Sequence, residues 1–248
     1  MEKILGKIIE IESVENIKAY VATPKTSIKG GVIVIHEVWG LDDHIKSVAD
    51  RLANEGYVAI APELLDVSDF SSEEIANIKS KLFDEAERNK VQPELRKLTA
   101  PMREPEFGRV TIERLRSVFD YIYDFEETKQ KIAVIGFCFG GSYSYSLSTI
   151  EPRLKLALPF YGHADQSVEE LSKIKCPVRA FYGENDYRLI EGLVDLKERM
   201  KEAGVDYKVK VYKDSGHAFF NDSNSKAYNK EAATDAWNEV ITELDKLN

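Results

Sequence analysis

A cysteine flanked by glycines has the clearest capacity for chemistry in this sequence. Cys138 lies in the segment Gly-Phe-Cys-Phe-Gly-Gly at positions 136–141, which has the G-x-nucleophile-x-G pattern of a nucleophile elbow. An apolar run at 131–137 precedes it and a helical pattern follows it. The thiol is therefore expected on a strained turn above a sheet, at a helix N-terminus that favours a thiolate. The alternative is a glycine-rich turn that holds a buried structural cysteine.

An acid and a histidine follow Cys138 in the chain order that such an elbow requires. Asp186 comes after an apolar run at 178–182, and His217 is the only histidine downstream of it. Together they predict acyl transfer, in which His217 moves the thiol proton, Asp186 orients the imidazole and backbone N–H groups hold the oxyanion. A turn aspartate and a surface-loop histidine are the alternative interpretations. Three other carboxylates compete for the role of the acid: Glu184, Asp165 and Asp214.

The remaining histidines and the second cysteine are expected to be mainly structural. His36 ends an apolar run and is interpreted as a satisfied core histidine, and His44 is expected on a helix surface. His163 follows an apolar run and is expected either to line the pocket or to take part in catalysis. Cys176 precedes a proline with no elbow around it, so we expect a buried small hydrophobe.

Short β-rich runs alternate with longer helical patterns along the chain. This alternation predicts one α/β domain over residues 1–248, with a mostly parallel sheet and helices on both faces. The first two runs alternate apolar and polar residues, which predicts an antiparallel hairpin. Expected strands cover 4–11, 17–22, 31–36, 57–61, 131–137, 154–161, 178–182 and 207–212. Expected helices cover 42–54, 71–89, 110–125, a segment after 138, 188–203 and 226–247.

Composition excludes several classes of function. The chain has 43 acidic and 34 basic residues, a formal net charge of −9, which disfavours binding to nucleic acid or to an anionic membrane. Two cysteines cannot build a disulfide framework or a cysteine-rich metal site. The N-terminal residues do not resemble a secretory signal, and no apolar run reaches the roughly 20 residues of a membrane span. We therefore expect a cytoplasmic protein.

Motifs spread over nearly the whole chain resemble the dienelactone hydrolases, also called carboxymethylenebutenolidases. The most specific is the cysteine elbow at 136–141, and the next is His-Glu-Val-Trp-Gly at 36–40. The resemblance implies an α/β-hydrolase fold, a Cys138, Asp186 and His217 triad, and hydrolysis of a carboxylic ester or lactone. Further matching segments are Ala-Pro-Glu-Leu at 61–64, Phe-Tyr-Gly at 160–162, Gly-Glu-Asn-Asp at 183–186 and Gly-His-Ala-Phe at 216–219.

The same resemblance implies further roles around the nucleophile. Glu37 would contact the resting Cys138 and take part in its activation, although from the sequence alone it could equally be an ordinary carboxylate at a strand end. The backbone N–H groups of Val38 and Phe139 would form the oxyanion hole. The resemblance implies no metal and no organic cofactor, and a small-molecule ester or lactone as the binding partner. A monomer or a small homo-oligomer is expected.

The sequence departs from the family pattern at the substrate carboxylate. Dienelactone-cleaving members carry an arginine four residues after the catalytic histidine, where this chain has Asn221, and a neutral amide cannot replace a guanidinium fork. Arg103 or Arg109, in or beside a segment at 92–107 with three prolines, could supply another substrate-binding arginine. That segment is expected to be a surface loop, with a mobile lid as the alternative. Aromatic residues expected in the pocket wall are Trp39, Tyr161, Phe219 and Phe139, with core packing as the alternative for the last two.

Three hypotheses for function follow from these residues. The first is a cysteine-dependent hydrolase of the dienelactone hydrolase type. The second is a broad carboxylesterase or thioesterase for uncharged substrates, suggested by Asn221. The third is a non-catalytic ligand-binding protein or a thiol redox sensor built on Cys138, since an exposed thiolate is also oxidisable.

Overall fold

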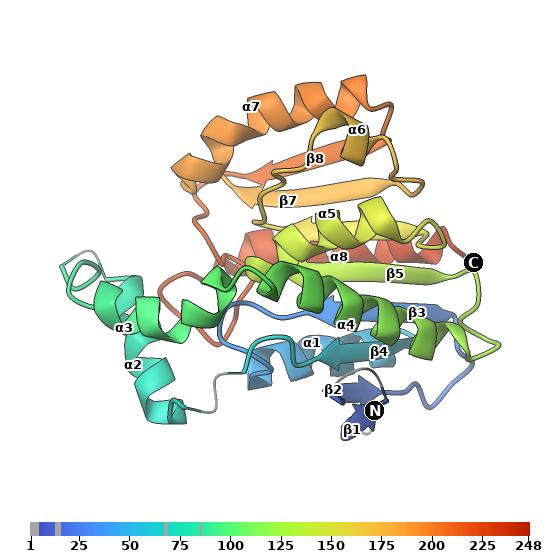
Figure 1. Ribbon diagram of the computed structural model, residues 1–248, viewed down its shortest axis with the longest axis horizontal. Helices are drawn as coiled ribbons and strands as arrows, with labels where there is room; N and C mark the ends of the chain where they lie inside the picture. Colours follow the sequence, from blue (N-terminus) through green and yellow to red (C-terminus); the bar gives the residue numbers. More distant parts are fainter. Residues whose placement is uncertain (1–4, 13–15, 67–68, 85) are drawn as a thin grey trace.

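In the computed structural model, which describes residues 5–12, 16–66, 69–84 and 86–248, eight strands form one sheet (Figure 1). Their order is β1-β2-β4-β3-β5-β6-β7-β8. β1 pairs antiparallel with β2, β2 pairs antiparallel with β4, and all other neighbours are parallel. The expected α/β fold with an antiparallel N-terminal hairpin is confirmed. The strands are β1 (Lys7–Ile11), β2 (Ile17–Ala22), β3 (Gly30–Ile35), β4 (Tyr57–Pro62), β5 (Ile132–Phe137), β6 (Leu156–Phe160), β7 (Val178–Gly183) and β8 (Tyr207–Tyr212).

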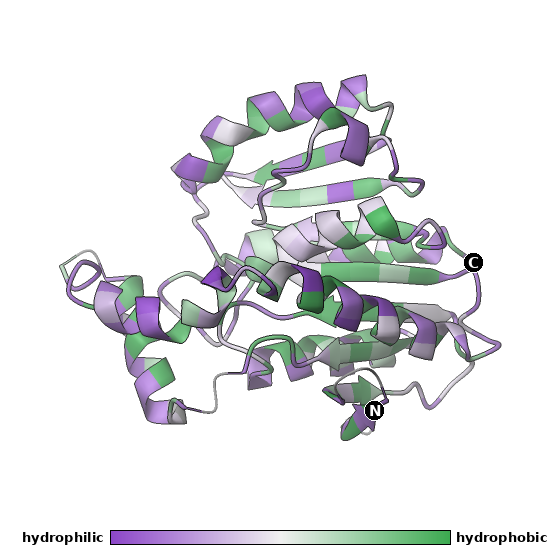
Figure 2. Ribbon diagram, viewed as in Figure 1, coloured by the Kyte–Doolittle hydropathy of each residue, from purple (hydrophilic) through white to green (hydrophobic). Residues whose placement is uncertain are grey.

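Helices cover both faces of the sheet. Alternate side chains of the central strands point to opposite sides, and because both sets are apolar, each face needs a layer of helices to bury it. In β3, Val32 and Val34 belong to one apolar core, whereas Ile33 and Ile35 belong to the other. The first core is closed by α1 and α8, and the second by α4, α5 and α7 (Figures 1 and 2). The helices are α1 (Asp43–Asn54), α2 (Ser72–Leu82), α3 (Gln92–Leu98), α4 (Phe107–Tyr123), α5 (Phe139–Ile150), α6 (Val168–Leu171), α7 (Tyr187–Glu202) and α8 (Lys230–Asp245).

Several helix boundaries differ from those expected. α2 ends at Leu82 rather than near 89, and Asp84 then accepts the backbone N–H of Ala86 in a turn. α8 begins at Lys230 rather than 226, because the Asn229 side chain caps it. The one-turn helix α6 is not anticipated by the sequence pattern. Residue 4 of the first expected strand and residue 85 of the second expected helix lie outside the described residues.

The expected irregular loop at 92–107 is wrong, because much of this segment is helical. It contains α3 and a 3-10 helix, η1 (Ala100–Arg103), and both have a proline in their first turn. Proline suits the first turn of a helix, where its missing N–H removes no hydrogen bond. α2 and α3 project to the left of the sheet in Figure 1. They share a small core of their own, which includes Trp39, Ile78, Val91 and Leu98.

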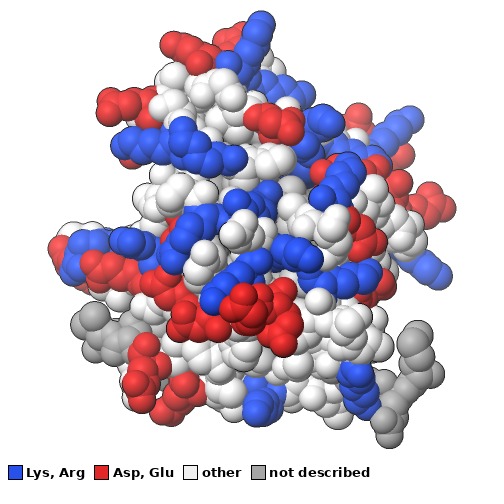
Figure 3. Space-filling view, turned by 90° about the vertical axis from the view of Figure 1, so that its right-hand side faces the viewer, with Lys and Arg blue, Asp and Glu red and all other residues white. Residues whose placement is uncertain are grey.

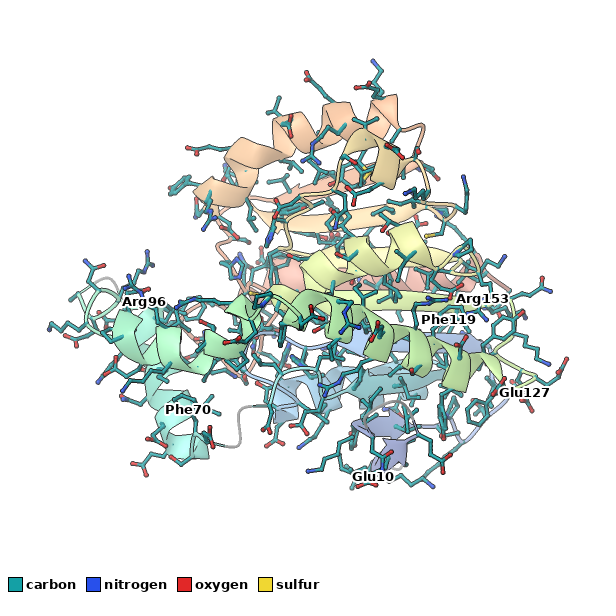
Figure 4. The ribbon with its side chains drawn as sticks, in the orientation of Figure 1. Glu10, Phe70, Arg96, Phe119, Glu127 and Arg153 are labelled. Carbon is teal, nitrogen blue, oxygen red and sulfur yellow. The ribbon has the colours of Figure 1, made fainter. Side chains whose placement is uncertain are left out.

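Arg153 connects the end of α5, the helix that follows the elbow, to α4. Its guanidinium donates to Asp120 and Glu151, each at 2.6 Å, and its centre lies 4.6 Å from the centroid of the Phe119 ring (Figure 4). Burial of the guanidinium opposes its charge, but the Glu151 hydrogen bond outweighs this effect and raises the pKa of Arg153. The group stays charged and holds the two helices together.

The surface carries mixed charge. Lys and Arg side chains alternate with Asp and Glu side chains over the face shown in Figure 3. Such interspersed charge does not form the single-sign basic surface that binds a phosphate backbone. Within the described part of the chain, no helix is both long and apolar enough to cross a membrane.

Candidate active site

The nucleophile elbow forms at the junction of β5 and α5. Cys138 lies between the two elements with a φ of 55° and a ψ of −110°. Positive φ at a non-glycine residue costs on the order of 1–3 kcal/mol and persists only where the surroundings enforce it. Two backbone hydrogen bonds of 3.0 Å do so here, from Cys138 N–H to Phe160 O and from Gly140 N–H to His36 O. These acceptors belong to the ends of β6 and β3, so both neighbouring strands hold the elbow.

The glycines of the elbow are required by close packing. A Cβ at Gly136 would lie 2.0 Å from the carbonyl oxygen of Gly140, and a Cβ at Gly140 would lie 2.2 Å from that of Ile35. Atoms cannot approach so closely without moving the backbone. The G-x-C-x-G spacing therefore follows from how tightly α5 packs against the strand ends.

Asp186 and His217 come from the ends of β7 and β8, and the structure brings them together. His217 Nδ1 lies 2.5 Å from Asp186 Oδ2, and the imidazole lines the same cavity as Cys138, whose charge acts on it. Burial disfavours the charged imidazole, but the Cys138 and Asp186 charges outweigh it and raise the pKa of His217 well above its ordinary 6.5. At neutral pH this arrangement favours an imidazolium next to the sulfur.

Glu37 is buried behind the nucleophile and is held by two donors. Asn221 Nδ2 donates to its Oε2 at 2.6 Å, and the Tyr161 hydroxyl donates to its Oε1 at 3.3 Å. Burial and the charges of Glu37 and Cys138 raise the pKa of Tyr161 well above its ordinary value, so this phenol remains a donor. No hydrogen bond joins Glu37 to Cys138 among the described side chains. Its part in activating the thiol stays a prediction.

Two backbone N–H groups are available for an oxyanion. Phe139 is the first residue of α5, so its N–H has no carbonyl acceptor one turn earlier in the helix. Val38 lies in the loop after β3, and neither N–H donates to another residue in the described part of the chain. Both residues line the cavity that contains Cys138. Their placement fits the expected oxyanion hole.

A cavity of about 630 Å³ opens over the sulfur. Cys138, Asp186 and His217 all line it, and so do Tyr161 and Phe139 from the expected aromatic wall. Its volume is within the range of small-molecule sites. Within the described residues, no group of three or more His, Cys, Asp and Glu side chains could hold a metal ion.

Three residues expected to bind substrate lie elsewhere. Trp39 packs in the small core of α2 and α3 and borders a different cavity. Phe219 is fully buried in the main core, as the core-packing alternative predicts. Arg103 is exposed on η1 and does not line the cavity, although its neighbour Met102 does. Asn221 is buried against Glu37, so it too is held away from the cavity.

The wall that α7 contributes to the cavity was not predicted from the sequence. Arg188, Leu189, Gly192 and Leu196 all line the cavity, at the three- and four-residue spacing of one helix face. Arg188 is exposed and forms no hydrogen bond or ion pair with another described residue. The apolar spacing of this helix was visible in the sequence, but nothing distinguished a cavity wall from a core contact.

The other histidines have three different environments. His36 is buried, donates from Nδ1 to Glu37 O at 2.6 Å and accepts the Leu64 N–H, and burial lowers its pKa to about 4. It is therefore a neutral structural residue, as expected. His44 is not on the surface as expected, because its helix face packs on Phe137 and Phe220. His163 lines the cavity, with Nδ1 2.9 Å from Ser142 Oγ.

Comparison with known proteins agrees with this geometry. The profile of the Dienelactone hydrolase family matches residues 17–247. The chain belongs to the dienelactone hydrolase family. A Saccharolobus solfataricus protein named "Putative carboxymethylenebutenolidase" is 34% identical, with 94% of this chain and 95% of that protein covered.

Solved structures share the fold of this family member. A Klebsiella pneumoniae protein named "Putative Dienelactone Hydrolase" superposes with a TM-score of 0.78 at 24% identity, covering 97% of this chain and 98% of that one. A dienelactone hydrolase-like promiscuous phosphotriesterase from metagenomic libraries superposes with a TM-score of 0.75 at 19% identity, covering 99% of each chain. At these identities the likeness supports the α/β-hydrolase fold.

Proposed function

We propose that this chain hydrolyses a carboxylic ester or lactone through a thioester on Cys138. The observation that carries the proposal is the position of His217, which hydrogen-bonds Asp186 and lines the same cavity as Cys138, whose charge raises the pKa of the imidazole. A thiolate next to an imidazolium is a prepared nucleophile and acid pair. Family membership supports the same class of reaction.

The reaction proceeds in two halves. The Cys138 thiolate attacks the carbonyl carbon, and the N–H groups of Val38 and Phe139 hold the resulting oxyanion. Collapse of this intermediate breaks the bond to the leaving oxygen, which takes the proton from the His217 imidazolium. Water then attacks the thioester as neutral His217 takes a water proton, and collapse releases the acid and the thiolate. Asp186 keeps the imidazole oriented throughout.

Glu37 is proposed as a positioning residue in the resting site. It lies between Asn221 and Tyr161, and its charge is among those that raise the pKa of Tyr161. Substrate entry would move it toward the sulfur, where its negative charge would favour attack by the Cys138 thiolate. This step rests on the family resemblance and on the buried position of Glu37.

Uncharged esters and lactones form the second candidate substrate class. Asn221 occupies the position where dienelactone-cleaving relatives carry an arginine, and it is committed to Glu37. It therefore offers no charge to a substrate carboxylate. Among the described residues, two arginines line the cavity; Arg199 is held by Asp195 and two backbone carbonyls, which leaves Arg188 to contact a substrate carboxylate.

The test is a paired turnover assay. Wild-type protein, Cys138→Ala and Cys176→Ala would each receive p-nitrophenyl acetate and cis- and trans-dienelactone. Cys176 is the matched control, because it is buried just before β7, whose other end leads to Asp186, and burial raises the pKa of its thiol to about 12. We expect turnover in the wild type and in Cys176→Ala and none in Cys138→Ala, with all three folded by circular dichroism.

Two other outcomes would change the conclusion. Full activity in Cys138→Ala would contradict the thioester mechanism. A wild type that cleaves none of these substrates but forms a stable sulfenate on Cys138 would favour the redox-sensing alternative. The ratio of dienelactone to p-nitrophenyl acetate turnover separates the two substrate classes.

A further inference from the structure

A glycine lies at the centre of the α7 wall of the active-site cavity. Gly192 is inside the helix, where glycine costs about 1 kcal/mol relative to alanine. Its neighbours on the same helix face, Arg188, Leu189, Asp195 and Leu196, all line the cavity. A Cβ at Gly192 would meet no atom within 4 Å. Neither a close contact nor a turn requires a glycine here.

A second glycine lies in a groove that adjoins the cavity. This groove has a volume of about 410 Å³, runs between α4 and α5, and shares Met102, Phe139, Ser142, His163 and Asp165 with the cavity. Gly108, in the first turn of α4, forms part of its wall. A Cβ there would meet only the Tyr143 hydroxyl, at 3.8 Å. Here too the absence of a side chain leaves space open.

The reacting atoms line the cavity but not the groove. Gly192 borders the cavity on the helix that starts at Asp186, the partner of His217. His217 must reach the leaving oxygen to protonate it, so the leaving group lies on this side. The groove touches neither Cys138 nor His217 among its lining residues, and begins beyond Phe139 and Ser142. The acyl group stays bonded to the sulfur, and the groove is the adjoining space into which its chain can extend.

We propose that Gly192 and Gly108 are specificity-determining residues. Gly192 keeps open the part of the cavity beside α7, the leaving-group arm, and Gly108 keeps open the groove between α4 and α5, the acyl arm. The inference rests on the proposed ester hydrolysis and names its substrate class. The preferred substrates are esters with a medium-length acyl chain and a ring-sized leaving group, rather than acetates of small alcohols.

The experiment fills each arm separately. Gly192→Phe and Gly108→Phe would be compared with wild type on two ester series that share vinyl acetate. Vinyl acetate, butyrate and octanoate vary the acyl group, and vinyl, p-nitrophenyl and 4-methylumbelliferyl acetates vary the leaving group. Acid release in a pH-stat gives kcat/KM for all of them.

Matched controls place the same bulk outside the two spaces. Val194→Phe lies on α7 and Arg116→Phe on α4, and both positions are exposed and line neither space. If circular dichroism shows that a phenylalanine variant does not fold, leucine at the same position fills the space with a smaller side chain.

We expect Gly108→Phe to lower the octanoate-to-acetate ratio of kcat/KM by about tenfold or more, because each acyl methylene that no longer fits the groove loses its apolar contact there. Its methylumbelliferyl-to-vinyl ratio should stay within about twofold of wild type. Gly192→Phe should show the reverse pattern. Unchanged ratios in both variants, or the two patterns exchanged, would overturn the inference while leaving ester hydrolysis intact. A wild type with no Cys138-dependent turnover would instead remove the proposed function, and this inference with it.

Discussion

The hydrogen bond between Asn221 and Glu37 offers a sharp test of how the site is held. Asn221 Nδ2 donates to Glu37 Oε2 at 2.6 Å, and both side chains are buried. Asn221 Oδ1 also accepts the N–H and the hydroxyl of Ser223, at 3.1 and 2.7 Å. Leucine has a similar length and supplies none of these bonds. Asn221→Leu therefore leaves a buried carboxylate with the longer Tyr161 bond alone.

The expected cost follows from these contacts. A hydrogen bond to a charged group contributes about 1.5–3 kcal/mol, and a neutral one about 0.5–1.5 kcal/mol. Part of the loss is offset by the apolar leucine in a buried site. We therefore expect Asn221→Leu to lower the free energy of unfolding by about 3 kcal/mol at pH 7. Ser223→Ala, which leaves the Glu37 bond intact, should cost about 1 kcal/mol.

A double-mutant cycle with Glu37→Gln isolates the interaction. Without the carboxylate, Asn221→Leu breaks only neutral hydrogen bonds, so we expect a coupling free energy of about 1–2 kcal/mol. Urea unfolding followed by circular dichroism gives the four free energies, with equal m-values as the check that the transitions are comparable. A coupling below about 0.5 kcal/mol would refute the reasoning, because additive effects mean that Asn221 does not hold the Glu37 charge.

Four further predictions concern the elbow and the cavity. Cys138→Ser should lower the pKa of His217, measured by NMR titration of the imidazole, because it removes the neighbouring sulfur charge that helps to raise it; an unchanged pKa would contradict this cause. The raised pKa of His217 stabilises the folded protein, and this contribution is complete below pH 6.5 and lost as the pH rises through the folded-state pKa. We therefore expect Cys138→Ser to lose less unfolding free energy than wild type between neutral and alkaline pH, measured by urea unfolding. Gly136→Ala, whose Cβ would lie 2.0 Å from the Gly140 carbonyl oxygen, should destabilise by at least about 3 kcal/mol or prevent folding, and a Tm close to that of wild type would refute the packing argument. Arg188→Gln should leave stability and neutral-ester turnover nearly unchanged and raise KM only for carboxylate-bearing lactones. An equal rise in KM for both substrates would mean that Arg188 does not bind the substrate carboxylate through its charge.

The fold was predictable because its signals are long and repeated. The run at 131–137 is apolar at nearly every position, as a strand buried on both faces requires, and it is β5 in the structure. The segment at 92–107 was not predictable, because its prolines are compatible with either a broken helix or the first turn of one. Only packing against Trp39 and its apolar neighbours decides between these possibilities.

The spatial grouping of the proposed catalytic residues was predictable for a reason that does not apply to the residues around them. Cys138, Asp186 and His217 each follow a strand, and carboxyl ends of parallel strands meet at one edge. Pocket walls have no such rule. Trp39 lies next to Val38 in sequence but packs under α2, where Lys79 covers its ring at 5.3 Å. The leucines of α7 have the spacing of any amphipathic helix, so only three-dimensional context shows what they face.

Backbone strain gathers around the sulfur, and this explains how the site stays aligned. Five described non-glycine residues have positive φ, and three of them lie at or beside the candidate site: Cys138, Tyr161 and Ala218, with φ values of 55°, 37° and 61°. They are the proposed nucleophile, a donor to Glu37 and the residue after the proposed base. At about 1–3 kcal/mol each, their strain is a large share of a typical unfolding free energy of about 5–15 kcal/mol. Cys138→Gly, which accepts positive φ, should therefore be about 1 kcal/mol more stable than Cys138→Ala in urea unfolding. If Cys138→Gly were instead less stable than Cys138→Ala by about 0.4–1 kcal/mol, the cost of glycine's freedom in the unfolded chain, the elbow would store no strain.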